Sequence, residues 1–192
     1  REETHTGLVR HVMARCSRKG EVMAVIVING RELPKEKELL AALKREVPSL
    51  ASLCVSVHTA RSNVILGDNY RVLFGEERLK DTLCGLTFSL SPLSFFQINP
   101  EQTEVLYQTA LDFAGLSGTE TVADVYCGAG TISLLLAKKA SRVIGLETVG
   151  AAVVDARENA RANGIENTEF LLGQAEELLP RLVEEGLRPD VI

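Results

Sequence analysis

The second half of the chain alternates strand-like and helix-like segments without a break, and this order constrains the fold more than any other feature. Short β-branched runs predict strands, and longer segments with apolar residues three and four apart predict helices. We expect strands at residues 121–125, 142–146, 168–172 and 190–192, with helices at 131–139, 150–163 and 175–183. Strands separated by helices pair in parallel, because each helix carries the chain back across the sheet. The sequence therefore predicts an α/β domain.

A further helix leads into this domain, and residues with capping preferences mark both of its ends. Asn99 is a preferred cap, Pro100 suits the first helical position, and Gly115 is a typical terminator. We expect its apolar residues to form the buried side: Val105, Leu106, Ala110, Leu111 and Phe113.

The first half of the chain mixes strands with one helix and carries no catalytic motif. The apolar run 22–28 predicts a strand covered on both faces, and a helix that begins near Lys35 stops at Pro48. Residues 53–58 alternate in polarity, which predicts a strand with one partly wet face. Further strands around 63–66 and 70–74 flank Gly67-Asp68-Asn69, a candidate hairpin turn. We expect a small mixed α/β domain over residues 1–92 and the α/β domain over residues 93–192.

Composition excludes several classes of protein. With 45% hydrophobic and 24% charged residues, the chain has the balance of a globular domain. Its apolar runs are far shorter than the ~20 residues that cross a bilayer, and a secretory signal is absent, so we expect a cytoplasmic protein without membrane segments. The nearest cysteines, Cys54 and Cys84, are 30 positions apart, which excludes closely paired metal ligands. We predict no metal site.

Positive charge is concentrated near the amino terminus, although the formal net charge is −5. Affinity for nucleic acid depends on where lysines and arginines gather, and not on their sum. The residues concerned, which are compatible with phosphate contacts, are Arg10, His11, Arg15, Arg18 and Lys19. A solvated loop is the alternative explanation, and we favour it.

The most informative stretch is Asp124-Val-Tyr-Cys-Gly-Ala-Gly-Thr131, at the point where the first parallel strand gives way to its helix. Ligands of open α/β sheets bind at this end of the strands. Gly128 and Gly130 let a ligand approach the backbone, and Thr131 begins a helix with free N–H groups. Glu147 ends the next strand, where a carboxylate can accept hydrogen bonds from both ribose hydroxyls. The alternative is a tight turn beside a solvated acid.

The acid therefore implies a cofactor that contains a nucleoside, and the glycine pattern alone also fits a nicotinamide dinucleotide. Ser133, however, replaces the third glycine of the dinucleotide fingerprint. Asp124 at the strand tip would repel a pyrophosphate, whereas it can bind the amino group of a methionine moiety. We therefore expect S-adenosyl-L-methionine.

Several segments follow one another in an order that is typical of a known family: His5-Thr-Gly7, residues 61–67, Ser94-Phe-Phe-Gln-Ile-Asn-Pro-Glu-Gln-Thr-Glu104, residues 124–133 and Asn159-Ala-Arg-Ala-Asn-Gly164. Together these segments resemble the bacterial RNA (uracil-C5) methyltransferases, particularly the 23S ribosomal RNA branch. The resemblance implies a Rossmann-like methyltransferase domain, of which residues 93–192 are the first half, behind an RNA-facing domain. It implies methylation of uridine carbon-5 with RNA as the partner. The alternatives are the cofactor-binding domain of a small-molecule or protein methyltransferase, and a nicotinamide-dependent oxidoreductase.

The same resemblance assigns cofactor contacts to individual residues. In addition to Asp124, the expected contacts are Gln97, Tyr126, Gly128, Gly130, Thr131, Glu147 and Gln174. The alternative for Gln174 is an exposed loop amide without a role. Phe95 and Phe96 are interpreted as core packing in preference to base stacking.

The chain also departs from that family. Members usually begin with a β-barrel RNA-binding domain and often an iron–sulfur site, and carry after the fourth strand a nucleophilic cysteine and a glutamate base. We expect these catalytic residues beyond Ile192, so that this fragment binds the cofactor without activity. Cys127 lies in the turn, where small size explains it. The family's strand order, 3-2-1-4, would leave a cut sheet edge through which chains self-associate.

Overall fold

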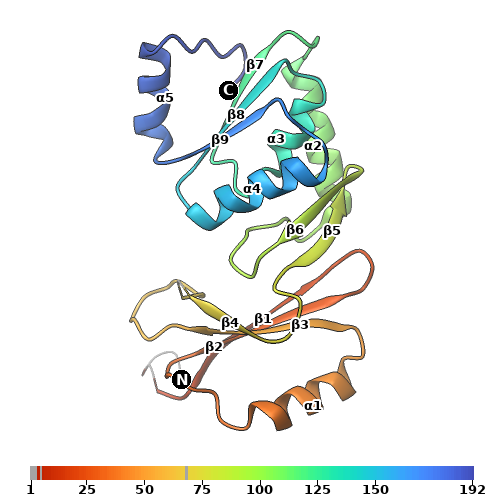
Figure 1. The fold of residues 1–192 in the computed structure, drawn as a ribbon, viewed down its shortest axis with the longest axis vertical. Coiled ribbons are helices and arrows are strands. Elements are labelled where there is room, and N and C mark those ends of the chain that lie inside the picture. Colours follow the sequence, from red (N-terminus) through yellow and green to blue (C-terminus); the bar gives the residue numbers. More distant parts are fainter. Residues whose placement is uncertain (1–3, 5, 68) are drawn as a thin grey trace. The chain divides into compact units, whose positions relative to one another are not determined.

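A computed structural model describes residue 4, residues 6–67 and residues 69–192, so His5 and Asp68 lie outside the described residues. The chain divides into two compact units, Arg1–Asp81 and Thr82–Ile192, which are considered separately (Figure 1). The expected division lay after residue 92. Residues 82–92 group with the second unit because their strand is bound to one of its helices, as described below.

The first unit is a four-stranded sheet with one helix. Its elements are β1 (Val9–Cys16), β2 (Val22–Ile28), α1 (Glu36–Glu46), β3 (Leu50–Val57) and β4 (Tyr70–Gly75). The strand order is β1-β2-β3-β4, in which β2 and β3 pair in parallel and the outer pairs are antiparallel. The predicted strand 22–28 and the helix that follows Lys35 are confirmed.

Both faces of this sheet are covered. Leu39 and Leu43 of α1 pack on one face, and Leu79 belongs to a cluster on the other. The prediction that β3 has a partly wet face is therefore wrong: Cys54 and Ser56 are as buried as their neighbours. The alternation of polar and apolar residues within a strand does not show that a distant segment, here the one with Leu79, packs on its polar face.

Residues 63–66 do not form the predicted strand. Instead, the loop between β3 and β4 is hydrogen-bonded to β3. Ser56 Oγ accepts from the Gly67 N–H at 3.0 Å and donates to the Asn69 carbonyl at 3.1 Å. β4 then pairs with β3 and needs no partner from the loop.

The second unit contains a two-stranded sheet, followed in the chain by a parallel sheet with helices on both faces. Its elements are β5 (Leu79–Leu83, which spans the division), β6 (Leu86–Leu90), α2 (Pro100–Ala114), β7 (Thr121–Val125), α3 (Thr131–Ala137), β8 (Arg142–Glu147), α4 (Gly150–Ala162), β9 (Thr168–Leu172) and α5 (Ala175–Glu184). The sheet order is β7-β8-β9, all parallel, as predicted. Val191 forms a parallel bridge with Val122, so a fourth strand begins on the other side of β7.

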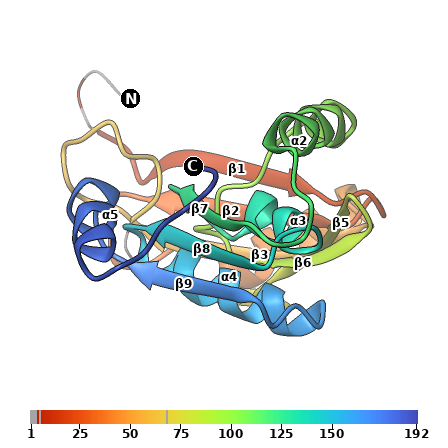
Figure 2. The same cartoon turned by 90° about the horizontal axis from the view of Figure 1, so that it is seen from above.

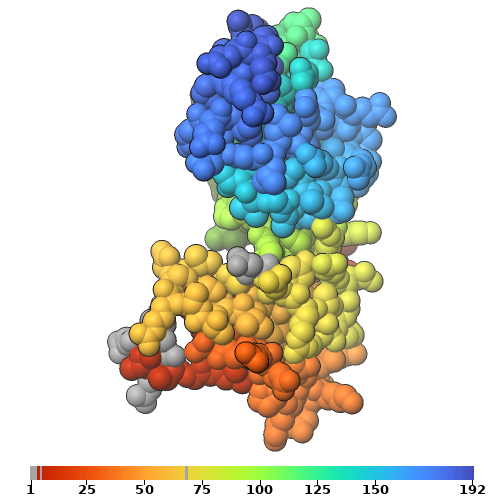
Figure 3. All heavy atoms as spheres, turned by 60° about the vertical axis from the view of Figure 1, so that its left-hand side comes forward, coloured from red at the N-terminus to blue at the C-terminus, as the bar shows by residue number. Residues whose placement is uncertain are grey.

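Separate apolar clusters lie on the two faces of this sheet. Residues of α2, α3 and α4 share the larger cluster, whereas α5 packs on Ile144 and Leu146. α5 accordingly lies across the sheet from α2 and α3 (Figure 2). In the space-filling view, α5, β9 and α4 form a continuous surface (Figure 3).

The predicted caps of α2 are confirmed, whereas its predicted buried side is confirmed at Leu111 and wrong at three other positions. Asn99 Oδ1 accepts from the Gln102 N–H at 3.1 Å, and Gly115 ends the helix with a φ of 58°. The buried residues are Thr103, Tyr107 and Leu111, at four-residue spacing. Among those expected inside, the exposed ones are Val105, Leu106 and Phe113. The prediction failed because it selected apolar residues, whereas two of the three buried residues are a threonine and a tyrosine.

Within the part of the chain that the structure describes, no helix is both long and apolar enough to cross a membrane. The same residues contain no group of three His, Cys, Asp or Glu side chains arranged to hold a metal ion.

Candidate functional site

The carboxyl ends of β7 and β8 meet at the glycine turn. The Gly128 N–H donates to Glu147 Oε2 at 2.9 Å, and the Cys127 N–H donates to the Leu146 carbonyl at 3.0 Å. Glu147 Oε1 accepts from the N–H groups of Thr148 and Val149, at 2.7 and 2.8 Å. The Glu147 carboxylate is therefore held in one orientation at the carboxyl end of the parallel strands.

The carboxyl end of β9 lies beside the carboxyl end of β8. The Gly173 N–H donates to the Glu147 carbonyl at 2.9 Å, so the next residue, Gln174, lies close to the end of β8. Gln174 is exposed and caps α5 without a side-chain hydrogen bond to its backbone. Its amide is consistent with both the cofactor contact and the exposed loop amide that the sequence left open.

Asp124 provides a second carboxylate near the tip of β7. Ser133 Oγ, on the first turn of α3, donates to Asp124 Oδ2. The pKa of Asp124 is raised from 3.8 to about 6, chiefly by burial and also by the negative charge of Glu147, although the hydrogen bonds from Ser133 act to lower it. This carboxyl group therefore titrates close to neutral pH.

Tyr126 extends outward from the turn between these two acids. Its φ is 67°, which is uncommon for a residue with a side chain, and its side chain is 61% exposed. The Tyr126 hydroxyl donates to Glu176 on the first turn of α5. This bond raises the pKa of Tyr126 and lowers that of Glu176. The sequence did not predict the pair, because the two residues lie on different elements.

The two glycines of the turn have different surroundings. A Cβ at Gly128 would meet no atom within 4 Å, so this position is open to a ligand. A Cβ at Gly130 would lie 3.1 Å from both Ala156 Cβ and Phe170 Cζ. Gly130 is therefore required by packing of the turn against α4 and β9, and not only by ligand approach.

Thr131 and Gln97 have less direct relations to the strand tips. Thr131 Oγ1 and the Tyr107 hydroxyl are 2.8 Å apart, so the Thr131 hydroxyl holds α2. Gln97 is half-buried in the loop between β6 and α2. Phe96 is 9% exposed and packs against Phe88, as predicted, but the prediction for Phe95 is wrong because that ring is 73% exposed.

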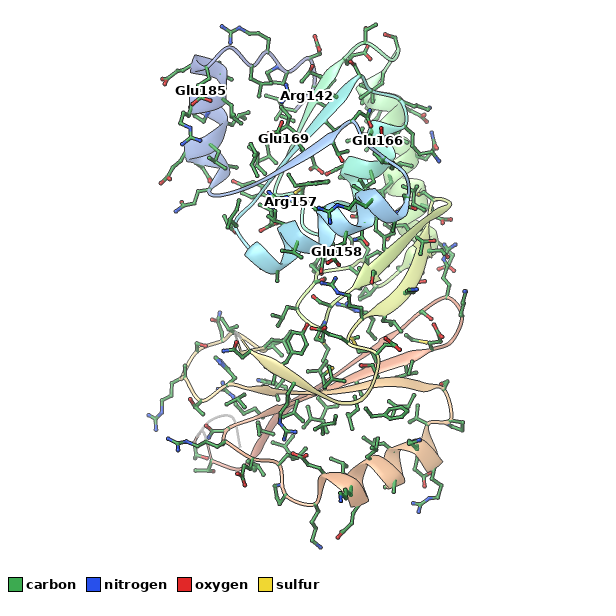
Figure 4. The ribbon with its side chains drawn as sticks, in the orientation of Figure 1. Arg142, Arg157, Glu158, Glu166, Glu169 and Glu185 are labelled. Carbon is green, nitrogen blue, oxygen red and sulfur yellow. The ribbon has the colours of Figure 1, made fainter. Side chains whose placement is uncertain are left out.

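Charged side chains away from the strand tips support the sheet. Arg142, the first residue of β8, pairs with Glu169 of β9 at 2.6 Å, at the end of the sheet opposite Glu147 (Figure 4). Arg157 of α4 donates to the Phe170 carbonyl at 2.5 Å. These contacts are structural, and the acids at the strand tips are distinct from them.

Cys127 lies in the turn but is only 5% exposed, and burial raises the pKa of its thiol. Cys54 is also buried, with a raised pKa from the same cause. Thiolate chemistry requires the opposite, a lowered pKa and access to solvent. Neither thiol has the properties of a nucleophile.

The solvated loop that the sequence favoured for the basic residues near the amino terminus is wrong, because Arg10, His11 and Arg15 belong to β1. Arg10 lies near the beginning of β1, whereas Arg18 and Lys19 follow its end. The Arg10 guanidinium donates to the carbonyls of His58 and Ala60 at 2.8 and 2.7 Å and so stabilises a loop.

Comparisons with known proteins agree with this arrangement. Residues 116–192 match a family model described as a methyltransferase domain. The chain is 50% identical over 187 residues to an uncharacterized RNA methyltransferase of Caldanaerobacter subterraneus subsp. tengcongensis, covering 97% of this chain and 41% of the relative. It is 48% identical over 192 residues to an uncharacterized RNA methyltransferase of Halalkalibacterium halodurans, covering 100% of this chain and 42% of the relative. The chain thus spans less than half the length of these curated relatives.

A solved structure is also similar. It is the crystal structure of Pyrococcus abyssi tRNA (uracil-54, C5)-methyltransferase in complex with S-adenosyl-L-homocysteine, with a TM-score of 0.73 and 27% identity over 92% of this chain and 42% of that one. The predicted fold class is confirmed as mixed α/β, with a methyltransferase domain that is preceded along the chain by a smaller β-rich domain. Over almost its whole length the chain is therefore similar to part of these RNA methyltransferases, and residues 116–192 match the model of a methyltransferase domain.

Proposed function

We propose that this chain binds S-adenosyl-L-methionine at the carboxyl ends of β7 and β8, within a protein that methylates carbon-5 of uridine in RNA. The observation that carries the proposal is the placement of two acids, Asp124 and Glu147, on neighbouring strand tips on either side of an open glycine turn. A homologue of known structure was crystallised with S-adenosyl-L-homocysteine, which supports this choice of cofactor.

The residues present fit the two polar ends of this cofactor. Glu147 would accept hydrogen bonds from the ribose hydroxyls, and Asp124 would accept one from the methionine ammonium group. Gly128 leaves room for close approach to the backbone. The other proposed contacts are Gln97, Tyr126, Gly130, Thr131 and Gln174. When bound, the cofactor supplies an electrophilic methyl group, and the residues of this chain bind and orient it.

Calorimetry with S-adenosyl-L-homocysteine and with NAD tests the cofactor assignment. We expect saturable binding of S-adenosyl-L-homocysteine and none of NAD, because Asp124 would face the NAD pyrophosphate. Binding of NAD alone would overturn the proposal in favour of an oxidoreductase. A melting temperature raised only by S-adenosyl-L-homocysteine would give independent support.

For the substrate we propose uridine in 23S ribosomal RNA, in the cytoplasm. The names of the relatives support RNA, and the similar solved structure is named for tRNA, so both RNAs belong in the test. Methylation at carbon-5 displaces the hydrogen there, so a protein containing this chain should release tritium from RNA labelled at uridine carbon-5. Release from 23S RNA is expected. Release from tRNA alone would contradict the ribosomal assignment, and methylation without release would exclude carbon-5.

A further inference from the structure

Two polar residues of α4 and the residue that caps its carboxyl end form a stripe that binds one edge of β6. Asp155, Asn159 and Asn163 are spaced four apart, so they lie on the same side of the helix. Their partners, which are spaced two apart, are Thr87 and Ser89 within β6 and Ser91, the first residue after it. Four helical residues rise about 6 Å and two strand residues about 6.6 Å, so the two spacings match.

Side chains of the stripe take the place of a neighbouring strand. Asn159 Oδ1 accepts from the Ser89 N–H at 2.7 Å, and Asn163 Oδ1 accepts from the Thr87 N–H at 2.9 Å. Asp155 Oδ2 accepts from the hydroxyls of Ser91, at 3.0 Å, and Ser94. Asp155 and Asn159 are 0% exposed. Buried polar groups are kept only where they are hydrogen-bonded, so the stripe fixes β6 and the loop after it.

Asn159 differs from the other two because it also binds the glycine turn. Its Nδ2 donates to the Ala129 carbonyl at 3.2 Å, between Gly128 and Gly130. One side chain therefore connects the turn at the end of β7 to the strand that leads into the loop of Gln97. Asn163 also binds Thr87, and its Nδ2 donates to the carbonyls of Thr87 at 2.7 Å and Asn159 at 2.8 Å. Within the described residues, these bonds do not reach the turn.

We infer that Asn159 is a positioning residue for the cofactor site: it holds the glycine turn against β6, so that the turn and the Gln97 loop keep a fixed spacing. The inference rests on the proposed cofactor binding. Asn159 is 0% exposed and binds the Ala129 carbonyl from the buried side of the turn, so it would act on the cofactor through the turn. Asp155 anchors the same loop through Ser91 and Ser94.

Asn163 provides a matched control for the test. Asn159→Ala and Asn163→Ala each remove an acceptor from a β6 amide, so both should lower the melting temperature. Only Asn159→Ala also frees the turn. At a temperature where both variants are folded, we expect Asn159→Ala to weaken S-adenosyl-L-homocysteine binding about three- to tenfold, whereas Asn163→Ala stays within twofold of the wild type.

Hydrogen exchange gives a second readout that needs no ligand. The N–H groups of Cys127 and Gly130 should exchange faster in Asn159→Ala and not in Asn163→Ala. Asn159→Ser, a smaller perturbation, replaces Asn159→Ala if the latter does not fold. Equal affinities and equal turn exchange in the two variants would overturn the inference while leaving cofactor binding intact. A wild type that binds no S-adenosyl-L-homocysteine would instead refute the proposed function, and with it a role for Asn159 in cofactor binding.

Discussion

Glu147 and Gly128 are joined by a hydrogen bond of 2.9 Å from the glycine N–H to the carboxylate. This bond links the last residue of β8 to the turn after β7, so the acid and the turn move together. Because backbone N–H groups of Thr148 and Val149 hold the other oxygen, the carboxylate is already oriented. A group fixed before binding loses little conformational freedom when a ligand arrives.

Replacing Glu147 should therefore affect affinity strongly. Glu147→Ala should weaken binding of S-adenosyl-L-homocysteine by about 1.5 kcal/mol or more, because charge-assisted bonds to the ribose are lost. Isothermal titration calorimetry measures the change. Glu166→Ala serves as the control, since Glu166 is an exposed acid between α4 and β9. An unchanged affinity in Glu147→Ala would remove Glu147 from the site.

The pH dependence of binding should identify Asp124. Because its pKa is raised to about 6, Asp124 is increasingly protonated below that pH and then cannot pair with an ammonium group. We expect affinity for S-adenosyl-L-homocysteine to fall as the pH is lowered through 6, measured by calorimetry between pH 5 and 8. Asp124→Asn should bind weakly and lack this step. A step of equal size in the variant would assign the titration to another group.

The stability of the protein should respond to Asp124 with the opposite sign. A carboxyl group whose pKa is raised by folding contributes most below its unfolded pKa of 3.8, and this contribution is lost as the pH rises through about 6. Relative to Asp124→Asn, the wild type should therefore become less stable between pH 4 and 7. Urea denaturation of both proteins at each pH measures the difference, and a constant difference would contradict the raised pKa.

Much of the second unit was predictable, because its elements follow local rules. Asn99, Pro100 and Gly115 mark the ends of α2 through capping preferences that act within one turn, and β7 and β9 were placed to the residue. The sheet order was implied by the resemblance to the methyltransferase family, and the order β7-β8-β9 agrees with it. Asp124 and Glu147 were found because strand tips in such a sheet converge.

Long-range side-chain contacts account for what the sequence did not reveal. Asn159 contacts Ser89 across 70 residues and Ala129 across 30, and no periodicity records such a pair. Phe95 and Phe96 are neighbours of the same residue type, yet Phe95 is exposed and Phe96 is buried. The backbone path of the loop decides which ring packs against Phe88, and the sequence does not reveal that path.

Matched substitutions at the two glycines should separate packing from ligand approach. Both have positive φ, so alanine strains the backbone by a similar amount, about 1 kcal/mol, at each position. Gly130→Ala should lose a further 1 to 3 kcal/mol, roughly, because its Cβ would press on Ala156 and Phe170. Urea denaturation measures both. Equal losses would show that the turn relaxes around the added methyl group.

Tyr126→Phe should change the titration of Glu176 with little effect on stability. The Tyr126 hydroxyl lowers the pKa of this carboxyl group, so its removal should return the pKa toward the usual value. An NMR titration that follows the Glu176 side chain provides the measurement. Glu177, the next acid on α5, serves as the internal reference. A pKa of Glu176 that does not change would show that the two side chains do not pair in solution.

Cys127 should be inert toward both thiol reagents and RNA. Burial disfavours its thiolate, so an aromatic disulfide reagent should modify the exposed Cys16 long before Cys127 in the folded protein. Addition to uracil carbon-6 requires a thiolate that reaches the base, and Cys127 faces the core. We therefore expect no transfer of labelled methyl groups to ribosomal RNA by these 192 residues. Methyl transfer that disappears in Cys127→Ser, while S-adenosyl-L-homocysteine binding persists, would make Cys127 the nucleophile and refute this prediction.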